Sequence, residues 1–418
     1  MDVGQEVLVL NVSKLKTILL ASGATFMAIT MIFLPEESFK ASIRGLKMWW
    51  EIVFPSLFPF FVIAELLIGF GVVRFIGTLL EPLMRPLFKV PGVGGFPWAM
   101  GMATGFPAGA KLTARLRQEK QLTKIEAERL VSFTNASSPL FIFGAVSVGF
   151  FHNPRLGIIL ALTHYLGNFC VGLMMRFYGK DGKDHKMIKE RKRTSSLFNI
   201  RQALSALHQT RMKNKQPIGK LLGDAVISSI HTLLMIGGFI ILFSVLNKLL
   251  LLLNITHILA SFFVILLSVF QLPIELSIPA IAGIFEITLG SQLTSELANA
   301  TLMQKTIIVS FILGFSGLSV QAQVASILAE TDIDFKPFFV ARIFQGIFAA
   351  FFTFLLWKPI ATKFQLESTQ ATAPVFLQQH DLWWHETVQY FAEIGPIITI
   401  LSLICYIFIY IKRMSSPV

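Results

Sequence analysis

Long apolar runs separated by short polar segments dominate this chain. The first run extends from Thr17 to Leu34 and follows two lysines, Lys14 and Lys16. A helix needs about 20 apolar residues to cross the hydrocarbon core of a bilayer. Further runs of spanning length cover 50–73, 131–151, 156–175, 221–247, 307–328, 337–357 and 395–411. The pattern predicts an all-α polytopic membrane protein with about eight transmembrane helices.

Two other apolar stretches are too rich in glycine, proline and hydroxyl residues for regular helices. They are "GFPWAMGMATGFPAGAKLT" at 95–113 and "LPIELSIPAIAGIFEITLGSQLT" at 272–294. Unpaired backbone groups cost several kcal/mol each in lipid, so irregular backbone is tolerated only inside protein or beside a wet cavity. We therefore expect two re-entrant, broken-helix segments, which in transporters form the solute site.

The two broken segments correspond to each other under a shift of 181 residues. Gly109, Leu112 and Thr113 fall on Gly290, Leu293 and Thr294. The surrounding order is also shared, with a span, a broken segment and two further spans. Identity is low, so the shared order of elements carries most of the weight. We predict an internal repeat of 41–177 and 221–358.

Charge predicts how the two halves are oriented. The segment after the first break carries Lys111, Arg115, Arg117, Lys120, Lys124 and Arg129, whereas the matching segment from Gln292 holds only Lys305. Since Lys and Arg concentrate on the cytoplasmic side, the first break opens inward and the second outward. Each half then crosses the membrane three times, so the halves are inverted repeats.

Composition adds a basic cytoplasmic loop to this picture. The chain is 54% hydrophobic and 14% charged, with a net charge of +12. Most of that charge lies between Arg176 and Lys220, where thirteen Lys and Arg face three acids. We interpret this loop by the positive-inside rule, with a membrane lipid or protein contact as the alternative. It lacks interleaved aromatics, which argues against nucleic acid as a partner.

The expected organisation therefore has five parts. They are an N-terminal transmembrane helix (1–40), the first repeat (41–177), a basic cytoplasmic loop (178–220), the second repeat (221–358) and an interfacial segment with a C-terminal transmembrane helix (359–418). Trp383 and Trp384 suggest that the last part begins at the membrane interface. The run from Ile255 to Phe270 fits either a further span or an interfacial helix.

Polar residues in the first repeat are candidate substrate-binding groups. Gly105 and Gly109 lie in the segment that interrupts the helix, and Lys111 follows that segment. Asn135, Ser137 and Ser138 precede Pro139 within an apolar run, where small polar residues can instead pack helices together. Lys111 is either a collector of anions at the cytoplasmic mouth or a snorkelling anchor at a helix end.

The second repeat offers a matching set. Its acid, Glu286, has either a coupling role, alone or paired with Lys111 or Arg342, or a structural role as a helix N-cap. The other candidate substrate-binding residues of this half are Thr288, Gly290, Ser316, Ser319 and Gln323. His164 and Gln345 occupy equivalent positions under the 181 shift and are further buried-polar candidates.

No motif points to an enzyme, a cofactor or a metal. The sequence has no HExxH, nucleophile elbow, Walker loop or Cys/His metal spacing. Its two cysteines, Cys170 and Cys405, lie in apolar runs, so no disulfide framework is expected. We predict no catalytic residue, no cofactor and no metal site.

Four of these segments together resemble a known family. "GFPAGAK" (105–111), "FTNASSPLFIFGAV" (133–146), "GIFEITLG" (283–290) and "GFSGLSVQAQ" (314–323) resemble the YlbJ/SpoVV sporulation integral membrane proteins, within the nucleoside-recognition or Gate-domain group. The resemblance implies a fold related to concentrative nucleoside transporters. It also implies transport of dipicolinic acid across the mother-cell-derived outer forespore membrane during sporulation.

Two other functions remain open from the sequence. The chain could be a non-transporting scaffold that recruits envelope-assembly factors during sporulation, with the basic loop as its docking surface. It could also carry another solute, such as a nucleoside. Expected partners are a small organic anion and membrane lipid, with a homo-oligomer or sporulation membrane partners as further alternatives.

Overall fold

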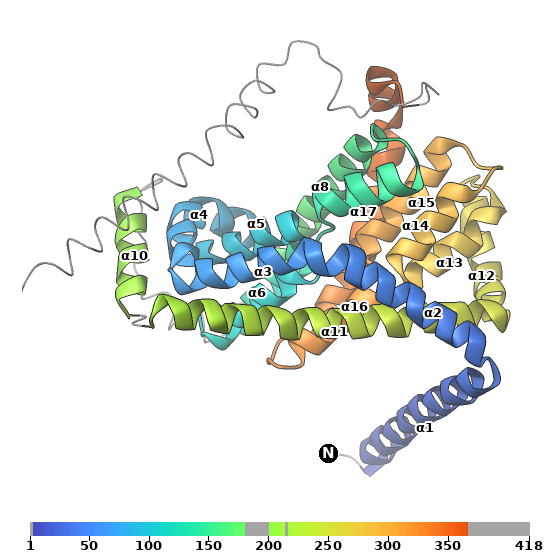
Figure 1. Cartoon of the computed structure of the whole chain (residues 1–418), viewed down its shortest axis with the longest axis horizontal. Coiled ribbons are helices and arrows are strands. Elements are labelled where there is room, and N and C mark those ends of the chain that lie inside the picture. The colour runs from blue at the N-terminus through green and yellow to red at the C-terminus, as the bar shows by residue number, and fades with distance from the viewer. Residues whose placement is uncertain (1–2, 180–199, 214–215, 367–418) are drawn as a thin grey trace, which may run out of the picture. The chain divides into compact units, whose positions relative to one another are not determined.

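Helices form every regular element in the described part of the chain. The computed structural model describes residues 3–179, 200–213 and 216–366 (Figure 1). The first elements are α1 (Val3–Phe33), α2 (Pro35–Met48), the π-helical η1 (Trp49–Val53), α3 (Phe54–Gly69), α4 (Val72–Phe88), η2 (Gly92–Gly94), α5 (Gly95–Thr104), α6 (Ala108–Gln118), α7 (Lys124–Thr134), η3 (Leu140–Phe150) and α8 (Leu156–Met175). The others are α10 (Ile200–Lys213), α11 (Ile218–Leu252), α12 (Ile255–Val269), η4 (Ile274–Leu276), α13 (Ser277–Phe285), α14 (Ile287–Glu296), α15 (Leu302–Phe315), α16 (Gly317–Leu328) and α17 (Phe335–Phe364).

The same order of elements occurs twice. Each series has a long helical stretch, a second helix, one 3₁₀ turn, two short packed helices, an interrupted helix and a final helix. The first series runs from α2 to α8, and the second from α11 to α17. An inverted relation of the two series across a membrane stays a prediction.

Four helical stretches among the described residues are long and apolar enough to cross a membrane. They are Leu156–Met175, Ile218–Leu252, Leu302–Leu328 and Phe335–Phe364. A fifth span is counted if Thr17–Phe33 and Pro35–Glu51, which are bent by 104°, form one unit. The predicted run 395–411 lies outside the described residues, as do Trp383 and Trp384.

Two predicted runs differ from the helices observed, and the run 255–270, left open between a span and an interfacial helix, forms a short helix. The run 50–73 belongs to a helical stretch that begins at Pro35. The charged residues of α2 lower the hydropathy before residue 50, so hydropathy alone places the start too late. The run 131–151 is interrupted at 135–139, where Pro139 supplies no backbone donor. Helix α12 has 15 residues, about 22 Å of helix, which is shorter than the ~30 Å hydrocarbon core.

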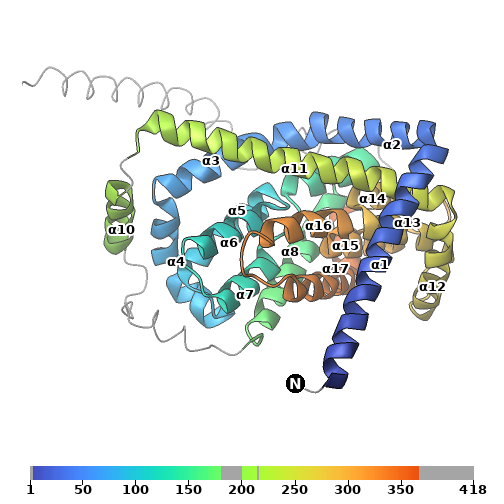
Figure 2. The ribbon, with the colours of Figure 1, turned by 90° about the horizontal axis from the view of Figure 1, so that it is seen from below.

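The long first helices of the two series pack side by side in opposite directions (Figures 1 and 2). Glu37 at the start of α2 pairs with Lys248 near the end of α11, at 2.9 Å. Farther along, Trp49 Nε1 donates to the Leu233 carbonyl at 2.9 Å. From the first contact to the second, the residue number rises from 37 to 49 on one side and falls from 248 to 233 on α11, so the helices are antiparallel.

Helices α8, α15 and α17 pack closely on one another. A Cβ on Gly314 would lie 2.8 Å from the Gln345 carbonyl oxygen, and one on Gly167 would lie 3.1 Å from the Ala349 nitrogen. Small residues allow helix backbones to approach closely where no hydrophobic effect drives association. Thr163 of α8 and Thr353 of α17 are also hydrogen-bonded at 3.1 Å. Helix α17 therefore packs both on α15 of its own series and on α8, the last helix of the first series.

Candidate functional site

The first hairpin turns at the break expected from the sequence. Helix α5 ends at Thr104, and α6 begins at Ala108. Gly105 has a φ of +89°, a conformation that costs glycine little because it has no Cβ. A Cβ there would lie 3.0 Å from the Ser138 nitrogen. The tip of the hairpin therefore packs on the interruption between α7 and η3.

Asn135 joins the hairpin to that interruption. Its Oδ1 accepts a hydrogen bond from Ala110 N, in the first turn of α6, at 3.1 Å, and the residue is fully buried. Gly109 lies beside it, since a Cβ on this glycine would be 2.0 Å from the Thr134 carbonyl oxygen. Asn135 thus supplies an acceptor to the N-terminus of a half-helix. A direct solute contact for Asn135, Gly105 or Gly109 stays a prediction.

The two serines after Asn135 have different surroundings. Ser137 N donates to His164 Nε2 at 2.9 Å, and its carbonyl accepts from the Tyr165 hydroxyl at 3.0 Å. Its own hydroxyl is buried without a partner. Ser138 Oγ accepts from Phe141 N at 3.2 Å and so caps the start of η3. Ser137 therefore keeps its side chain free for another group, whereas Ser138 uses its side chain locally.

Glu286 is the junction between the two helices of the second hairpin. It has extended backbone between α13 and α14, and its carboxylate accepts from Thr288 N at 3.0 Å and Leu289 N at 2.8 Å. A carboxylate at this place satisfies free N–H groups and opposes the positive end of the helix. The N-cap interpretation is therefore confirmed, and neither Lys111 nor Arg342 pairs with Glu286.

The second interruption packs on the second hairpin. Ser316 and Gly317 have φ values of 70° and 64°, and a Cβ on Gly317 would lie 3.3 Å from the Gly283 carbonyl oxygen. Within the hairpin, a Cβ on Gly290 would lie 2.1 Å from the Gly283 Cα. Both series therefore bring a hairpin against the break in the helix that follows it.

The remaining candidates of the second half surround this break. Ser316 Oγ donates to the Phe315 carbonyl at 2.6 Å, and Ser319 and Gln323 are buried on α16. Thr288 is partly buried. Gln321, two residues before Gln323, is also buried and donates to the Phe315 carbonyl at 3.1 Å. Both amides of α16 are therefore buried.

Lys111 is ion-paired inside the structure. Its Nζ lies 3.2 Å from Glu65 Oε1 and 3.2 Å from Ser228 Oγ, and Ser228 Oγ in turn donates to Glu65 at 3.0 Å. The Lys111 and Glu65 side chains are only 17% and 13% exposed. The two expected roles of Lys111, a collector of anions or a snorkelling helix-end anchor, stay predictions, and the structure adds that its charge is paired with Glu65.

Glu65 is the residue that the sequence reading missed. It stands in the apolar run 50–73, and an acid within such a run is a functional hypothesis by default. The sequence therefore contained a signal for Glu65. It contained none for the pairing of Glu65 with Lys111 and Ser228, because these residues come together only when α3, α6 and α11 pack.

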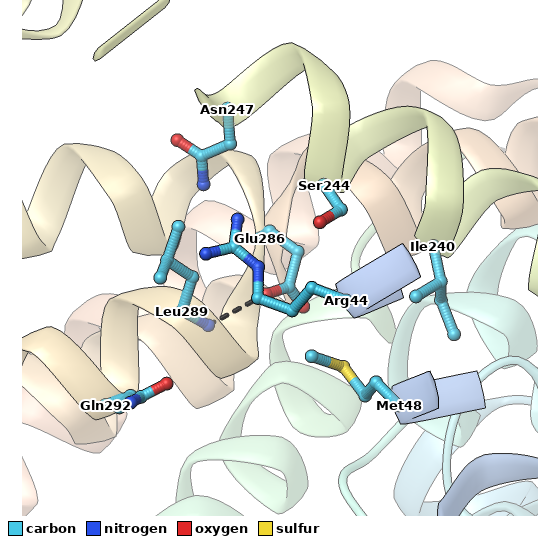
Figure 3. Close-up of a pocket in the computed structure, with 8 residues that line it drawn as sticks. All are labelled: Arg44, Met48, Ile240, Ser244, Asn247, Glu286, Leu289 and Gln292. Atoms are coloured by element: carbon cyan, nitrogen blue, oxygen red, sulfur yellow. Dashed lines mark hydrogen bonds between the residues drawn. The ribbon is translucent and has the colours of Figure 1, made fainter. Parts of the chain in front are cut away.

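Two small pockets occupy corresponding places beside the hairpins. One, of about 10 Å³, is lined by Glu65, Ala108 and Lys111 among others. The other, of about 20 Å³, has room for an ordered water. Its lining includes Leu289 and Gln292, which correspond to Ala108 and Lys111 under the 181 shift. Figure 3 shows Arg44 of α2 and Asn247 of α11 beside Glu286 in the second pocket.

A set of buried polar side chains lies between α7, α8 and α17. Arg342 is fully buried and donates from Nη1 to the Asn135 carbonyl at 2.5 Å and from Nη2 to the Ser132 carbonyl. His164 and Gln345 are also fully buried. The structure therefore gathers these three candidates at the first interruption. His231, by contrast, is exposed on α11.

Comparison with known proteins identifies the family. The chain is 56% identical over 415 residues to the sporulation integral membrane protein YlbJ of Bacillus subtilis, covering 97% of this chain and 99% of that protein. The chain belongs to the YlbJ family of sporulation integral membrane proteins. Residues 50–151 match the Gate family, described as nucleoside recognition. In the YlbJ-family chain, this match covers the whole first hairpin and Asn135, Ser137 and Ser138.

Two weaker similarities accompany this match. An uncharacterized protein of Alkalihalophilus pseudofirmus is 30% identical over 144 residues, which cover 34% of this chain and 30% of that protein. A solved structure of CNTnw in an outward-facing state has 12% identity and a TM-score of 0.35, over 80% of this chain and 87% of that one.

Proposed function

We propose that this YlbJ-family chain is a membrane transporter for a small organic anion. The substrate that we propose is dipicolinic acid, moved across the outer forespore membrane during sporulation. The observation that carries the proposal is the pairing, in both series, of a hairpin with the break in the next helix. Gly105 packs on Ser138 in one series, and Gly317 packs on Gly283 in the other. Paired broken helices near the centre of a membrane protein typically form a solute site.

Helix directions support the inverted arrangement that alternating access requires. The corresponding first helices, α2–α3 and α11, are antiparallel. The corresponding last helices are antiparallel too, because Thr163 of α8 contacts Thr353 of α17 and Gly167 faces Ala349. Equivalent helices that run in opposite directions are expected for inverted repeats and not for parallel ones.

Contacts between loops agree with the sidedness derived from charge. Arg117 and Lys124 at the α6–α7 corner pair with Asp332 and Asp334 at the α16–α17 corner, at 2.6 and 2.8 Å. Both corners are predicted to be cytoplasmic. At the other end, Asn153 Nδ2 donates to the Leu366 carbonyl at 2.8 Å, and both of these segments are predicted to be external.

The electrostatics of the hairpins support an anionic solute. Helix α6 begins at the first hairpin tip without an acidic cap, and its Ala110 N–H is bonded to the neutral Asn135 amide, so no charge neutralises its positive end. Glu286 neutralises the corresponding end of α14 and is held by two backbone N–H groups. Its negative charge is therefore opposed locally, and it need not contact a dianion.

A nucleoside is the second candidate substrate. It is favoured by one observation, the match of residues 50–151 to a family described as nucleoside recognition. Amides and hydroxyls such as those of Asn135 and Ser137 can bind a neutral base or sugar as well as a carboxylate.

Uptake into liposomes that contain only this protein tests the proposal. We expect saturable accumulation of labelled dipicolinate. Unlabelled dipicolinate should inhibit this uptake by competition, and uridine should not. Asn135→Ala should reduce uptake strongly, because the hairpin loses its anchor, while Asn299→Ala in the α14–α15 loop serves as the matched control. Uridine uptake without dipicolinate uptake would favour the nucleoside carrier. Uptake of neither solute under any ion gradient would contradict transport.

A further inference from the structure

Arg342 is a fully buried cation without an acidic partner. It lies on α17 at 0% exposure, with its guanidinium 5.3 Å from the centroid of the Phe338 ring. None of the ion pairs within 3–179, 200–213 and 216–366 includes Arg342. Burying a charge is costly unless it is both paired and hydrogen-bonded. Arg342 meets only the second condition.

Its hydrogen bonds compensate part of the charge. The carbonyls of Ser132 and Asn135 lie at the end of α7, where unpaired carbonyls form the negative end of the helix. They use two of the five N–H donors of the guanidinium. Arg342 Nε has no hydrogen-bond partner within the described part of the chain. A helix end carries about half an elementary charge, so positive charge remains uncompensated.

Other unpartnered polar atoms surround the same interruption. They are Ser137 Oγ, His164 Nδ1, Asn168 Oδ1 and both amide atoms of Gln345, each in a residue that is at most 1% exposed. The backbone brings them together. Ser137 N donates to the His164 ring, and a Cβ on Gly167, one turn from His164, would lie 3.4 Å from the Gln345 carbonyl oxygen. Gln345 is one helical turn from Arg342, on the same side of α17.

Most of these atoms are hydrogen-bond donors. His164 Nε2 accepts from Ser137 N, so a neutral His164 ring carries its proton on Nδ1. The unpartnered donors are then His164 Nδ1, Arg342 Nε, the Gln345 amide nitrogen and the Ser137 hydroxyl. The unpartnered acceptors are two, the amide oxygens of Gln345 and Asn168. Buried polar groups are normally satisfied, so this surplus requires an explanation. A cation surrounded by spare donors suits a carboxylate, which only accepts hydrogen bonds.

We propose that Arg342, His164, Ser137 and Gln345 form the site that binds a carboxylate group of the transported solute. This inference rests on the proposed function and assigns its charge recognition to α17 and not to Lys111, whose charge Glu65 already neutralises. The solute reaches the site when the α5–α6 hairpin moves, because the tip of that hairpin packs on Ser138 and Thr134. Arg342 then supplies the charge and the other three side chains supply orientation.

A purely structural role makes a different prediction for Gln345. If its amide only fills space, Gln345→Met removes two unsatisfied polar atoms and leaves solute binding unchanged. If it binds the solute, the same change leaves the Tm equal or higher but weakens binding of dipicolinate about 10- to 100-fold, the loss expected for a hydrogen bond to a charged group. The affinity for dipicolinate therefore distinguishes the two roles, and an equal or higher Tm shows that a loss of affinity is not caused by unfolding.

The test measures dipicolinate affinity and Tm on the purified, full-length protein. The variants are Gln345→Met, Ser137→Ala and Arg342→Gln, with Gln209→Met on the exposed face of α10 as the matched control. We expect all three site variants to bind dipicolinate more weakly and Gln209→Met to match the wild type. Arg342→Gln should weaken binding of dipicolinate and of pyridine-2-carboxylate alike, because each offers a carboxylate to the site.

Two outcomes would overturn the assignment in separable ways. Wild-type affinity for dipicolinate in Gln345→Met and Ser137→Ala would exclude this site while leaving transport intact. If the wild-type protein neither binds nor transports any carboxylate, that result contradicts the proposed function, and with it the carboxylate site that rests on that function. If Arg342→Gln does not fold, Gln345→Met and Ser137→Ala still decide, since neither removes a charge.

Discussion

At the scale of single residues, the contacts of Lys111 change what its charge can do. The ion pair with Glu65 and the bond to Ser228 tie α6 to the two long helices. Removing one partner of a buried pair leaves an uncompensated charge, which costs more than the pair itself contributes. Lys111 therefore ties the hairpin to α3 and α11, and its charge is balanced by Glu65 in this structure.

Lys111→Met and Glu65→Gln should each lower the free energy of unfolding by about 1–3 kcal/mol, because each leaves one charged or polar partner half-buried. The double variant should recover part of that loss, with a coupling energy of about 1 kcal/mol or more in a double-mutant cycle. Denaturation followed in detergent measures all three variants. Arg115→Gln, which breaks an exposed pair with Glu119 on the same helix, should change stability by less than about 0.5 kcal/mol. Strictly additive losses would contradict the pairing.

Residue types pointed to candidate positions, but not to their partners. Asn135 and Glu286 stood out because polar groups are rare in apolar runs. The capping role of Glu286 was predictable, since an acid after a break suits a helix N-terminus. The partners of Arg342 were not predictable, because they are backbone carbonyls of a helix about two hundred residues away in the sequence.

At the scale of elements, the hairpins depend on glycines that let two backbones touch. A Cβ on Gly290 would lie 2.1 Å from the Gly283 Cα. No side-chain rotation relieves a contact with backbone, so α13 and α14 would have to separate. On α11, a Cβ on Gly223 would meet nothing within 4 Å. These two glycines therefore form a matched pair for testing the close approach.

Gly290→Ala should destabilise the protein by about 1–3 kcal/mol or more, as overpacking does in a close-packed interior. Gly223→Ala should be neutral or stabilising by about 0.5–1 kcal/mol, because alanine is the better helix former. Thermal unfolding of both variants in the same detergent measures the difference. Equal Tm values for the two variants would show that the hairpin helices are not in contact.

The corner between α16 and α17 predicts a pH dependence. The Arg117 guanidinium holds the pKa of the Asp332 carboxyl below its usual value by a hydrogen bond and its charge. A lowered pKa in the folded state stabilises the protein above the unfolded value near 3.8, and that contribution disappears as pH falls through the folded pKa. Asp332→Asn should thus lower the Tm slightly at pH 7, by an amount worth at most about 1 kcal/mol because the pair is partly exposed. The difference should vanish at acid pH, and a constant difference would contradict the pairing.

Hydropathy predicted some elements well and others poorly. The spans at 156–175, 221–247, 307–328 and 337–357 were readable because they are continuous and apolar. Helix α2 was not, because charged residues recur along its whole length, although it packs on α11 and continues through η1 into α3. The π-helical geometry of η3 after Pro139 likewise left no signal in composition.

At the scale of the whole molecule, the central claim is that the two series are inverted. A shift of 181 residues relates their hairpins, and the antiparallel packing of α2–α3 on α11 and of α8 on α17 supports the inversion. Charge asymmetry alone predicted this relation from the sequence. What the sequence could not provide was the direction in which equivalent helices cross each other.

One pair of positions tests the inversion directly. Gln118 at the end of α6 and Asn299 after α14 correspond under the 181 shift, and both are exposed. Each is replaced by cysteine in a chain without Cys170 and Cys405, and intact cells are treated with a membrane-impermeant maleimide. Inverted repeats predict labelling of Asn299→Cys from outside, and of Gln118→Cys only after the membrane is permeabilised. Labelling of both positions from the same side would contradict the inverted arrangement and the transport mechanism built on it.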